Sequence, residues 1–205
     1  MALGNQRGEW DDYEWFRLAD LPAPRPRRPP PPPPVAAVEE DDTTAGALGE
    51  ALTGWVRSNP VWHDGAGDRV LLVDLDNLRA GAVRWRARME LVVALARTAD
   101  HVVISGQHAA VGRGLPHLAE FGAVAQPVPD GADLADFVLL EGAQAVPARS
   151  RQVVVLSNDG IFAELADRGP VTVLSPGASA LSDRLFDAAR VVIDLMTLER
   201  RLAPA

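Results

Sequence analysis

A run of four aliphatic residues at positions 70–73 is followed at once by Asp74 and Asp76, with Asn77 next. Because the apolar residues are consecutive and do not alternate with polar ones, the run is typical of a strand buried on both faces, as in a parallel α/β sheet. Ligands bind such sheets at the carboxyl ends of the strands. We therefore expect a core strand whose carboxyl end positions Asp74 and Asp76 in a functional site.

Segments of strand and helix character alternate along the rest of the chain. Strands are predicted at 69–75, 101–105, 123–128, 151–157, 171–174 and 191–194, and helices at 44–58, 83–98, 108–121, 133–145, 161–166 and 181–189. Strict alternation of strands and helices predicts a mainly parallel sheet with crossover connections. We expect residues 44–205 to form one α/β domain, a Rossmann-like three-layer sandwich.

Residues 1–43 differ from this domain in composition. Six successive prolines at 29–34 predict a polyproline II spacer of about 3.1 Å per residue, and the acids at 39–42 are expected to extend the linker. We expect 1–43 to be a disordered tail. Four aromatic residues near its start lie among four acids: Trp10, Tyr13, Trp15 and Phe16. They are either incidental to a disordered leader or a short peptide that folds onto a protein partner or onto this domain.

The chain contains no cysteine, and all 20 of its basic residues are arginine. This composition excludes disulfides, thiolate metal sites, cysteine nucleophiles and every mechanism that needs a lysine. Any bound metal must therefore be held by oxygen or histidine. No apolar run approaches the roughly 18 residues of a membrane span, and the amino terminus lacks a signal-peptide core. We expect a cytoplasmic protein without a membrane partner, and no pattern in the chain indicates its oligomeric state.

The aspartates of three segments are predicted to meet at one edge of the sheet. Asp133 and Asp136 open the helix after the third strand, and Asp159 follows the fourth. In a parallel sheet these positions share an edge with Asp74 and Asp76. Carboxylates held close together repel one another unless a cation binds, and Mg²⁺ or Mn²⁺ prefers oxygen ligands. Such an ion can lower the pKa of a bound water and stabilise charge on a reacting phosphate.

The net charge of −8 does not exclude a nucleic-acid partner. Residues 1–50 carry 10 acids and 5 arginines, and residues 51–205 carry 18 acids and 15 arginines. If the five aspartates named above bind a metal, the rest of the domain has 13 acids against 15 arginines. A mildly basic surface around an acidic pocket is compatible with binding to a polyanion.

Each acid also has a structural interpretation. Asp133 is placed to cap the following helix, with Asp136 as its capping-box partner. Asn158 or Asp159 can cap the turn that follows the fourth strand, and Asp76 can simply face solvent. This interpretation is weakest for Asp74, because an acid at the end of an apolar strand carries a desolvation penalty unless something compensates it.

Three segments, at 73–78, 129–136 and 154–163, resemble the successive motifs of the NYN domain, a branch of the PIN-like metal-dependent ribonucleases. The resemblance spans about residues 68 to 195, and 171–175 followed by 181–185 is similar to the actinobacterial forms. It implies a PIN-like fold and a Mg²⁺- or Mn²⁺-dependent endonuclease that cuts RNA to leave a 3′-hydroxyl and a 5′-phosphate.

The resemblance also implies roles for individual residues. Asp74 and Asp159 would be primary metal ligands, and Asp133 and Asp136 would complete or water-bridge the site, with Asp76 beside them. Asn77 would orient Asp74 or the substrate phosphate, while Ser157 would steady its loop. The residues expected to bind RNA are Asn77, Ser157, Asn158, Arg79, Arg84 and Arg88. Arg84, Arg86 and Arg88 share one face of the helix at 83–98, which is either a solvated surface or a phosphate contact.

Two other functions stay open. Many NYN domains have a second acid two residues after the position of Asp159, where this chain has Ile161. The domain can therefore be a catalytically weakened adaptor that binds RNA or protein.

A haloacid-dehalogenase-like phosphatase is the other alternative. Asp74 and Asp76 would be its nucleophile and acid–base residue, with Ser105 and Asp159 in its later motifs. Leu78, where that family usually has Thr or Val, and the absence of lysine count against it.

Overall fold

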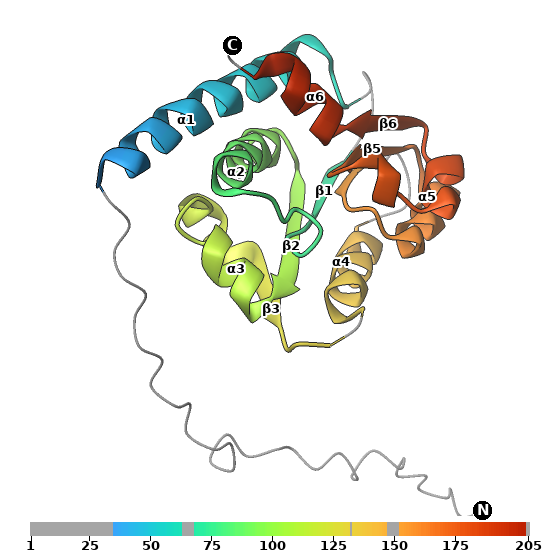
Figure 1. Cartoon of the computed structure of the whole chain (residues 1–205). Helices are drawn as coiled ribbons and strands as arrows, with labels where there is room; N and C mark the ends of the chain where they lie inside the picture. Colours follow the sequence, from blue (N-terminus) through green and yellow to red (C-terminus); the bar gives the residue numbers. More distant parts are fainter. Residues whose placement is uncertain (1–34, 63–67, 132, 147–151, 204–205) are drawn as a thin grey trace, which may run out of the picture. The chain divides into compact units, whose positions relative to one another are not determined.

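One six-stranded sheet forms the centre of the domain, and all of its strands run parallel (Figure 1). The computed structural model describes residues 35–62, 68–131, 133–146 and 152–203. The strands are β1 (Arg69–Asp74), β2 (His101–Gln107), β3 (Ala125–Val128), β4 (Gln152–Leu156), β5 (Val171–Ser175) and β6 (Val191–Asp194). Helices flank the sheet, so the expectation of an α/β, Rossmann-like three-layer sandwich is confirmed.

The helices alternate with the strands along the chain. The α-helices are α1 (Val35–Ser58), α2 (Ala82–Ala96), α3 (His108–Gly114), α4 (Leu134–Ala145), α5 (Asp183–Ala188) and α6 (Leu195–Leu202). The 3-10 helices in the described residues are η2 (Ala119–Val124), η3 (Gly160–Arg168) and η4 (Ala178–Ala180). Residues of α2 and α3 pack on one face of the sheet, and residues of α4, η3 and α5 pack on the other.

Strand β1 is buried on both faces, as its unbroken aliphatic run predicts. Leu71 and Val73 belong to the core cluster that contains α2 and α3, whereas Val70 and Leu72 belong to the cluster that contains α4 and η3. Successive side chains of a strand point to opposite faces, so a centrally placed strand needs apolar residues at every position. The run at 70–73 therefore fixes β1 at the centre of the sheet.

The order of the strands across the sheet is β3-β2-β1-β4-β5-β6. The chain proceeds outward from β1 to β3, then returns and adds β4 on the other side of β1. The connections after β1 and β4 therefore lead away from each other, which leaves a crevice at the carboxyl ends of these two strands. The acids that follow β1 and β4 lie at this crevice.

Helix α1 packs against α2 and α6, and α6 also packs against β5 and β6. Leu48 and Leu52 of α1 pack with Ala87 of α2 and Leu198 of α6. The start predicted for the first helix, at residue 44, is wrong, because α1 begins at Val35 and includes the expected linker at 39–42. Residues 35–45 contain neither proline nor glycine, and alanine and glutamate favour a helix.

Two other expected helices differ in the structure. The helix predicted at 108–121 is wrong, because α3 ends at Gly114 and a 3-10 helix follows from Ala119. Pro116 lies between them, and proline cannot donate the backbone hydrogen bond that a continuous helix requires. The segment predicted as a short helix at 161–166 is the 3-10 helix η3.

The expectations for the amino-terminal segment lie outside the described residues, including the Pro-rich tail and the aromatic cluster of Trp10 to Phe16. The chain divides into Met1–Pro33 and Pro34–Ala205, and all described elements belong to the second unit. None of the helices in the described part combines the length and the apolar character that crossing a bilayer requires.

Candidate functional site

Asp74 is the last residue of β1 and is only 2% exposed. Its Oδ1 accepts hydrogen bonds from the backbone N–H groups of Asp76 (3.0 Å) and Asn77 (3.2 Å). Its Oδ2 accepts from the Asn77 side-chain amide and from the Ser157 hydroxyl at 3.0 Å. Burial raises the pKa of Asp74, while these hydrogen bonds act in the opposite direction. The carboxylate thus stabilises the conformation of the loop after β1 and links this loop to the loop after β4 through Ser157.

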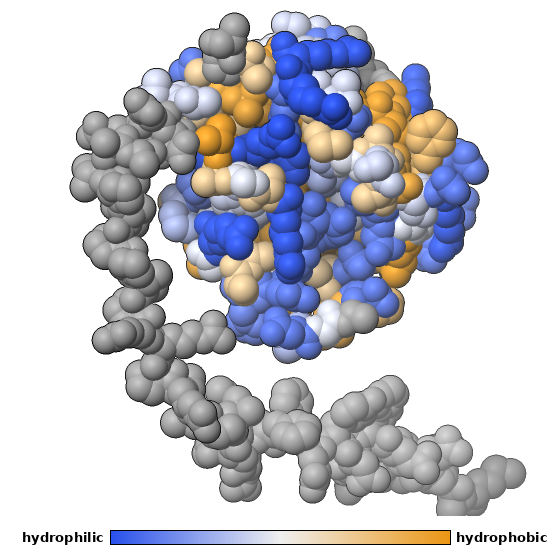
Figure 2. All heavy atoms as spheres, in the orientation of Figure 1, coloured by the Kyte–Doolittle hydropathy of each residue, from blue (hydrophilic) through white to orange (hydrophobic). Residues whose placement is uncertain are grey.

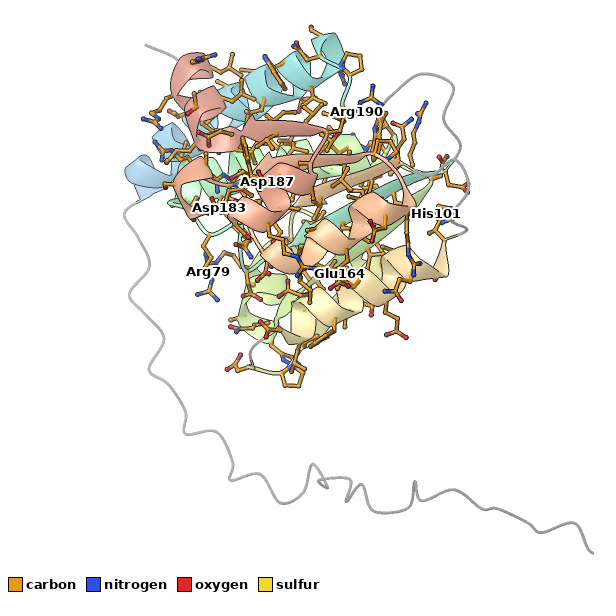
Figure 3. All side chains as sticks on the ribbon, turned by 90° about the vertical axis from the view of Figure 1, so that its right-hand side faces the viewer. Arg79, His101, Glu164, Asp183, Asp187 and Arg190 are labelled. Carbon is orange, nitrogen blue, oxygen red and sulfur yellow. The ribbon has the colours of Figure 1, made fainter. Side chains whose placement is uncertain are left out.

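Asp76 links the same loop to the neighbouring strand. Its Oδ1 pairs with the Arg79 guanidinium at 2.9 Å, and its Oδ2 accepts from the backbone N–H of Gln107 at 2.7 Å. Arg79 is exposed and also contacts the Gln107 side chain at 3.3 Å. Figure 3 shows Arg79 at the same edge of the domain as Asp183, whereas His101, the first residue of β2, lies toward the opposite edge.

Asp133, Asp136 and Asp159 form a compact group of acids. One carboxylate oxygen from each residue lies within 4.8 Å of the others. Asp133 has a left-handed backbone, with φ of 61°, at the N-cap position of α4, but its side chain makes no capping hydrogen bond. The capping interpretation of Asp133 is therefore wrong for its side chain. Asp159 does cap η3, because its Oδ1 accepts from the N–H of Ile161 at 2.9 Å.

Asp136 lies in the first turn of α4 and is 8% exposed. Its pKa is raised to about 7, first by burial and then by the negative charges of Asp74, Asp159, Asp133 and Asp76. Each of the other four predicted aspartates is thus close enough to Asp136 to repel its negative charge. At neutral pH this position holds either a proton or an unfavourable negative charge.

A hollow of about 210 Å³ opens beside these acids. Its lining includes Asp74, Asp76, Asn77, Asp133 and Asp136. Asp159 is not part of the lining and reaches the group from the β4 side of the crevice. A cation is positioned by its ligand oxygens, and those of Asp133, Asp136 and Asp159 lie within 4.8 Å of one another.

Ser157 and Asn158 hold the loop after β4 in place. The Ser157 hydroxyl donates to Asp74 and accepts from the backbone N–H of Asp159 at 3.1 Å. The Asn158 side-chain oxygen Oδ1 accepts from the Ser175 hydroxyl at 2.6 Å, and its side-chain amide N–H donates to the Gly177 backbone carbonyl at 3.4 Å. Both Ser157 and Asn158 are buried. Their side chains therefore act within the protein, which makes them supports of the site rather than evident substrate contacts.

The predicted solvated position of Arg88 is wrong, because this residue is only 3% exposed. Its guanidinium pairs with both carboxylate oxygens of Glu199, at 2.5 and 3.1 Å. It also donates to the carbonyl groups of Leu78 (3.3 Å) and Pro176 (2.9 Å). Arg88 thus connects the loop after β1, the loop after β5 and helix α6 through its hydrogen bonds. A buried guanidinium in this arrangement is not available to a phosphate at the surface.

Arg84 and Glu199 complete this second polar group. The Arg84 guanidinium is half-exposed and lies 3.7 Å from the Glu199 carboxylate. Sequence reasoning missed Glu199 because helix α6 was not predicted. The sequence does indicate helix α6, because the spacing of Leu195, Leu198 and Leu202 places three apolar residues on one helical face.

The structure therefore divides the predicted site residues into two groups. One group lies at the crevice between β1 and β4 and contains Asp74, Asp76, Asn77, Arg79, Asp133, Asp136, Ser157, Asn158 and Asp159. The other contains Arg84 and Arg88, both paired with Glu199.

Comparisons with known proteins do not assign the chain to a family. No family model matches it, and no curated protein matches it. A solved structure of a protein of unknown function, VPA0982 from Vibrio parahaemolyticus, is 18% identical and covers 64% of this chain and 95% of that chain, with a TM-score of 0.40. A similarity of that size indicates neither a fold family nor an activity for this protein.

Proposed function

We propose that this protein is a metal-dependent endoribonuclease that hydrolyses RNA phosphodiester bonds at the group of aspartates between β1 and β4. The observation that carries the proposal is the position of Asp136, which is buried, repelled by four other aspartates and raised in pKa to about 7. A buried acid among other acids is costly without a counter-charge. Perturbed acids in a crevice are typical of functional sites.

The side chains fit a hard divalent cation. All donors in the group are carboxylate oxygens, which Mg²⁺ and Mn²⁺ prefer, and the three closest oxygens lie within 4.8 Å of one another. Asp133, Asp136 and Asp159 would hold the ion, with Asp74 and Asp76 adding negative charge beside it. When bound, the ion would stabilise charge on a phosphate oxygen and make a water molecule more acidic.

The protein's own residues would position the substrate around this centre. Arg79 is exposed next to Asp76, so its guanidinium is placed to contact a phosphate at the edge of the hollow. The Asn77 amide and the Ser157 hydroxyl hold Asp74 in one orientation. A rigid carboxylate preserves the geometry of a cation site during the reaction.

The haloacid-dehalogenase-like alternative is less compatible with Asp74. A nucleophilic carboxylate must reach the substrate, yet Asp74 is buried and both of its oxygens accept hydrogen bonds from the protein. The adaptor alternative remains a second candidate, because Ile161 contributes its backbone N–H to Asp159 and its side chain packs against the core.

An RNA cleavage assay separates these functions. End-labelled single-stranded and hairpin RNAs are incubated with Mn²⁺, Mg²⁺ or chelator, and the product ends are mapped. A nuclease should give metal-dependent internal cuts with 5′-phosphate ends, and Asp136→Asn should abolish them. Intact RNA that nevertheless binds the protein would favour the adaptor, and release of phosphate from a small phosphomonoester would favour the phosphatase.

A further inference from the structure

A second hollow, of about 410 Å³, lies beside the amino-terminal end of α2 and next to α3. It is lined by Ala80, Ala82, Trp85, Arg86, Arg113 and His117. Its volume exceeds that of a single ion and falls in the range of ligand pockets, which is roughly 300–1,000 Å³. Three of these residues carry basic side chains, and none is acidic.

Arg113 and Trp85 form a stacked pair in this hollow. The guanidinium carbon of Arg113 lies over the Trp85 ring, 5.2 Å from its centroid. Trp85 is only 4% exposed and belongs to the main core, whereas Arg113 is exposed on α3. The rigid ring therefore holds a cation at the surface through its negative face. A guanidinium ordered in this way loses less conformational freedom when it binds an anion.

The charges around the pair leave the hollow positive. Among the described residues, Arg113 lies in no ion pair with an acid. Arg86 is 3.6 Å from Glu90, which balances part of its charge. The first turn of α2, which begins at Ala82, adds the positive end of its helix dipole. The electrostatics therefore favour an anionic group over a neutral one.

The hollow is next to the candidate metal centre in the sequence. Ala80 directly follows Arg79, and Arg79 pairs with Asp76 at the first hollow. The β1–α2 loop therefore has the acidic group at its start and the basic hollow at its end. Figure 2 shows hydrophilic residues running through the middle of the viewed face. A strand of RNA whose phosphate reached the aspartates would have further phosphates along this loop.

We propose that the hollow lined by Trp85 and Arg113 binds a phosphate of a single-stranded RNA next to the bond that is cut, with Arg113 as its main ligand. Guanidinium groups bind phosphate through parallel hydrogen bonds, and a neighbouring base can stack on the outer side of the Arg113–Trp85 pair. This inference rests on the proposed function, because it takes RNA as the substrate. It adds a binding site outside the group of aspartates.

Fluorescence anisotropy with a labelled single-stranded oligouridine tests the inference. Binding is measured in chelator at several salt concentrations, so that no cleavage takes place. Arg113→Ala should weaken binding by roughly 5- to 10-fold and reduce the salt slope by about 0.7, the value for one contact to a single strand. Arg113→Lys should keep the salt slope and recover only part of the affinity, because an ammonium does not stack as a guanidinium does.

Arg190→Ala is the matched control. It removes the same charge from an exposed position just before β6, toward the edge of the domain opposite Arg79 (Figure 3). The control should bind like the wild type, and both alanine variants should melt at the wild-type temperature. Binding by Arg113→Ala within twofold of the wild type, equal losses in the two alanine variants, or no RNA binding by the wild type would each overturn the inference. Arg113-dependent binding without any metal-dependent cut would instead support the RNA-binding site at Arg113 and refute the proposed activity.

Discussion

Replacing Asp136 by asparagine should stabilise the metal-free protein at neutral and alkaline pH. Asparagine has nearly the shape of a protonated aspartate but never carries its charge. Asp136 is buried and surrounded by four acids, and its pKa is raised from 3.8 to about 7. Because the folded chain binds this proton more tightly than the unfolded chain, the contribution of Asp136 to stability is greatest at low pH and is lost as the pH rises from about 4 to about 7.

The size of the effect follows from the pKa difference. About three pKa units at 1.36 kcal/mol each correspond to about 4 kcal/mol at pH 8, as an upper bound. At pH 5 the unfolded aspartate is ionised while the folded one is still protonated, so the expected gain falls to about 1.5 kcal/mol. The pH dependence therefore separates relief of charge repulsion from a change in packing, which would be equal at both pH values.

Urea unfolding followed by circular dichroism, in chelator at pH 5 and pH 8, measures this difference. Asp187→Asn is the matched control, since Asp187 is exposed on α5 (Figure 3), and it should leave the midpoint unchanged. Added Mn²⁺ should stabilise the wild type more than Asp136→Asn, because only the wild type keeps the full set of ligands. An Asp136→Asn variant that unfolds at the wild-type urea concentration at pH 8, or that gains equally at both pH values, would refute the reasoning.

Three further predictions concern other parts of the domain. Glu199→Gln should lower the free energy of unfolding by about 3–5 kcal/mol, because it leaves the Arg88 guanidinium buried without a counter-charge; a loss below about 1 kcal/mol in urea would contradict this. Gly142→Ala should cost about 1–3 kcal/mol, since a new Cβ would lie 2.7 Å from a methyl group of Val103, and an unchanged melting temperature would show that α4 can shift. The affinity for Mn²⁺ should rise as the pH increases through about 7, where Asp136 loses its proton; a flat calorimetric profile between pH 6 and 8 would oppose a role of Asp136 as a ligand.

The sequence was sufficient for the architecture and for the place of the candidate site. The consecutive aliphatic residues of β1 required burial on both faces, and the alternation of segments required parallel strands. These two facts place every acid after a strand at the same edge of the sheet. The contact between Asp74 and Ser157, 83 positions apart in the chain, follows from that arrangement.

The errors have different causes, and for Arg88 the cause is a tertiary contact that local patterns do not contain. The sequence pattern indicates that Arg88 lies on a solvated helix face. In the structure α6 supplies Glu199 as the partner of the buried Arg88 guanidinium. Asp133 occupies an N-cap position, yet its backbone is left-handed and its side chain makes no capping hydrogen bond. The acidic residues at 39–42 resemble a linker in composition, yet they are compatible with a helix and belong to α1.

Calorimetric titration of Mn²⁺ tests most directly the central claim that the aspartates between β1 and β4 hold a divalent cation. The wild-type protein should bind Mn²⁺ saturably at pH 8, and Asp136→Asn and Asp159→Asn should each lose most of that binding while remaining folded. The Asp187→Asn control should bind as the wild type does. Wild-type protein that shows no saturable binding, or Asp136→Asn and Asp159→Asn variants that bind with undiminished affinity, would contradict the account.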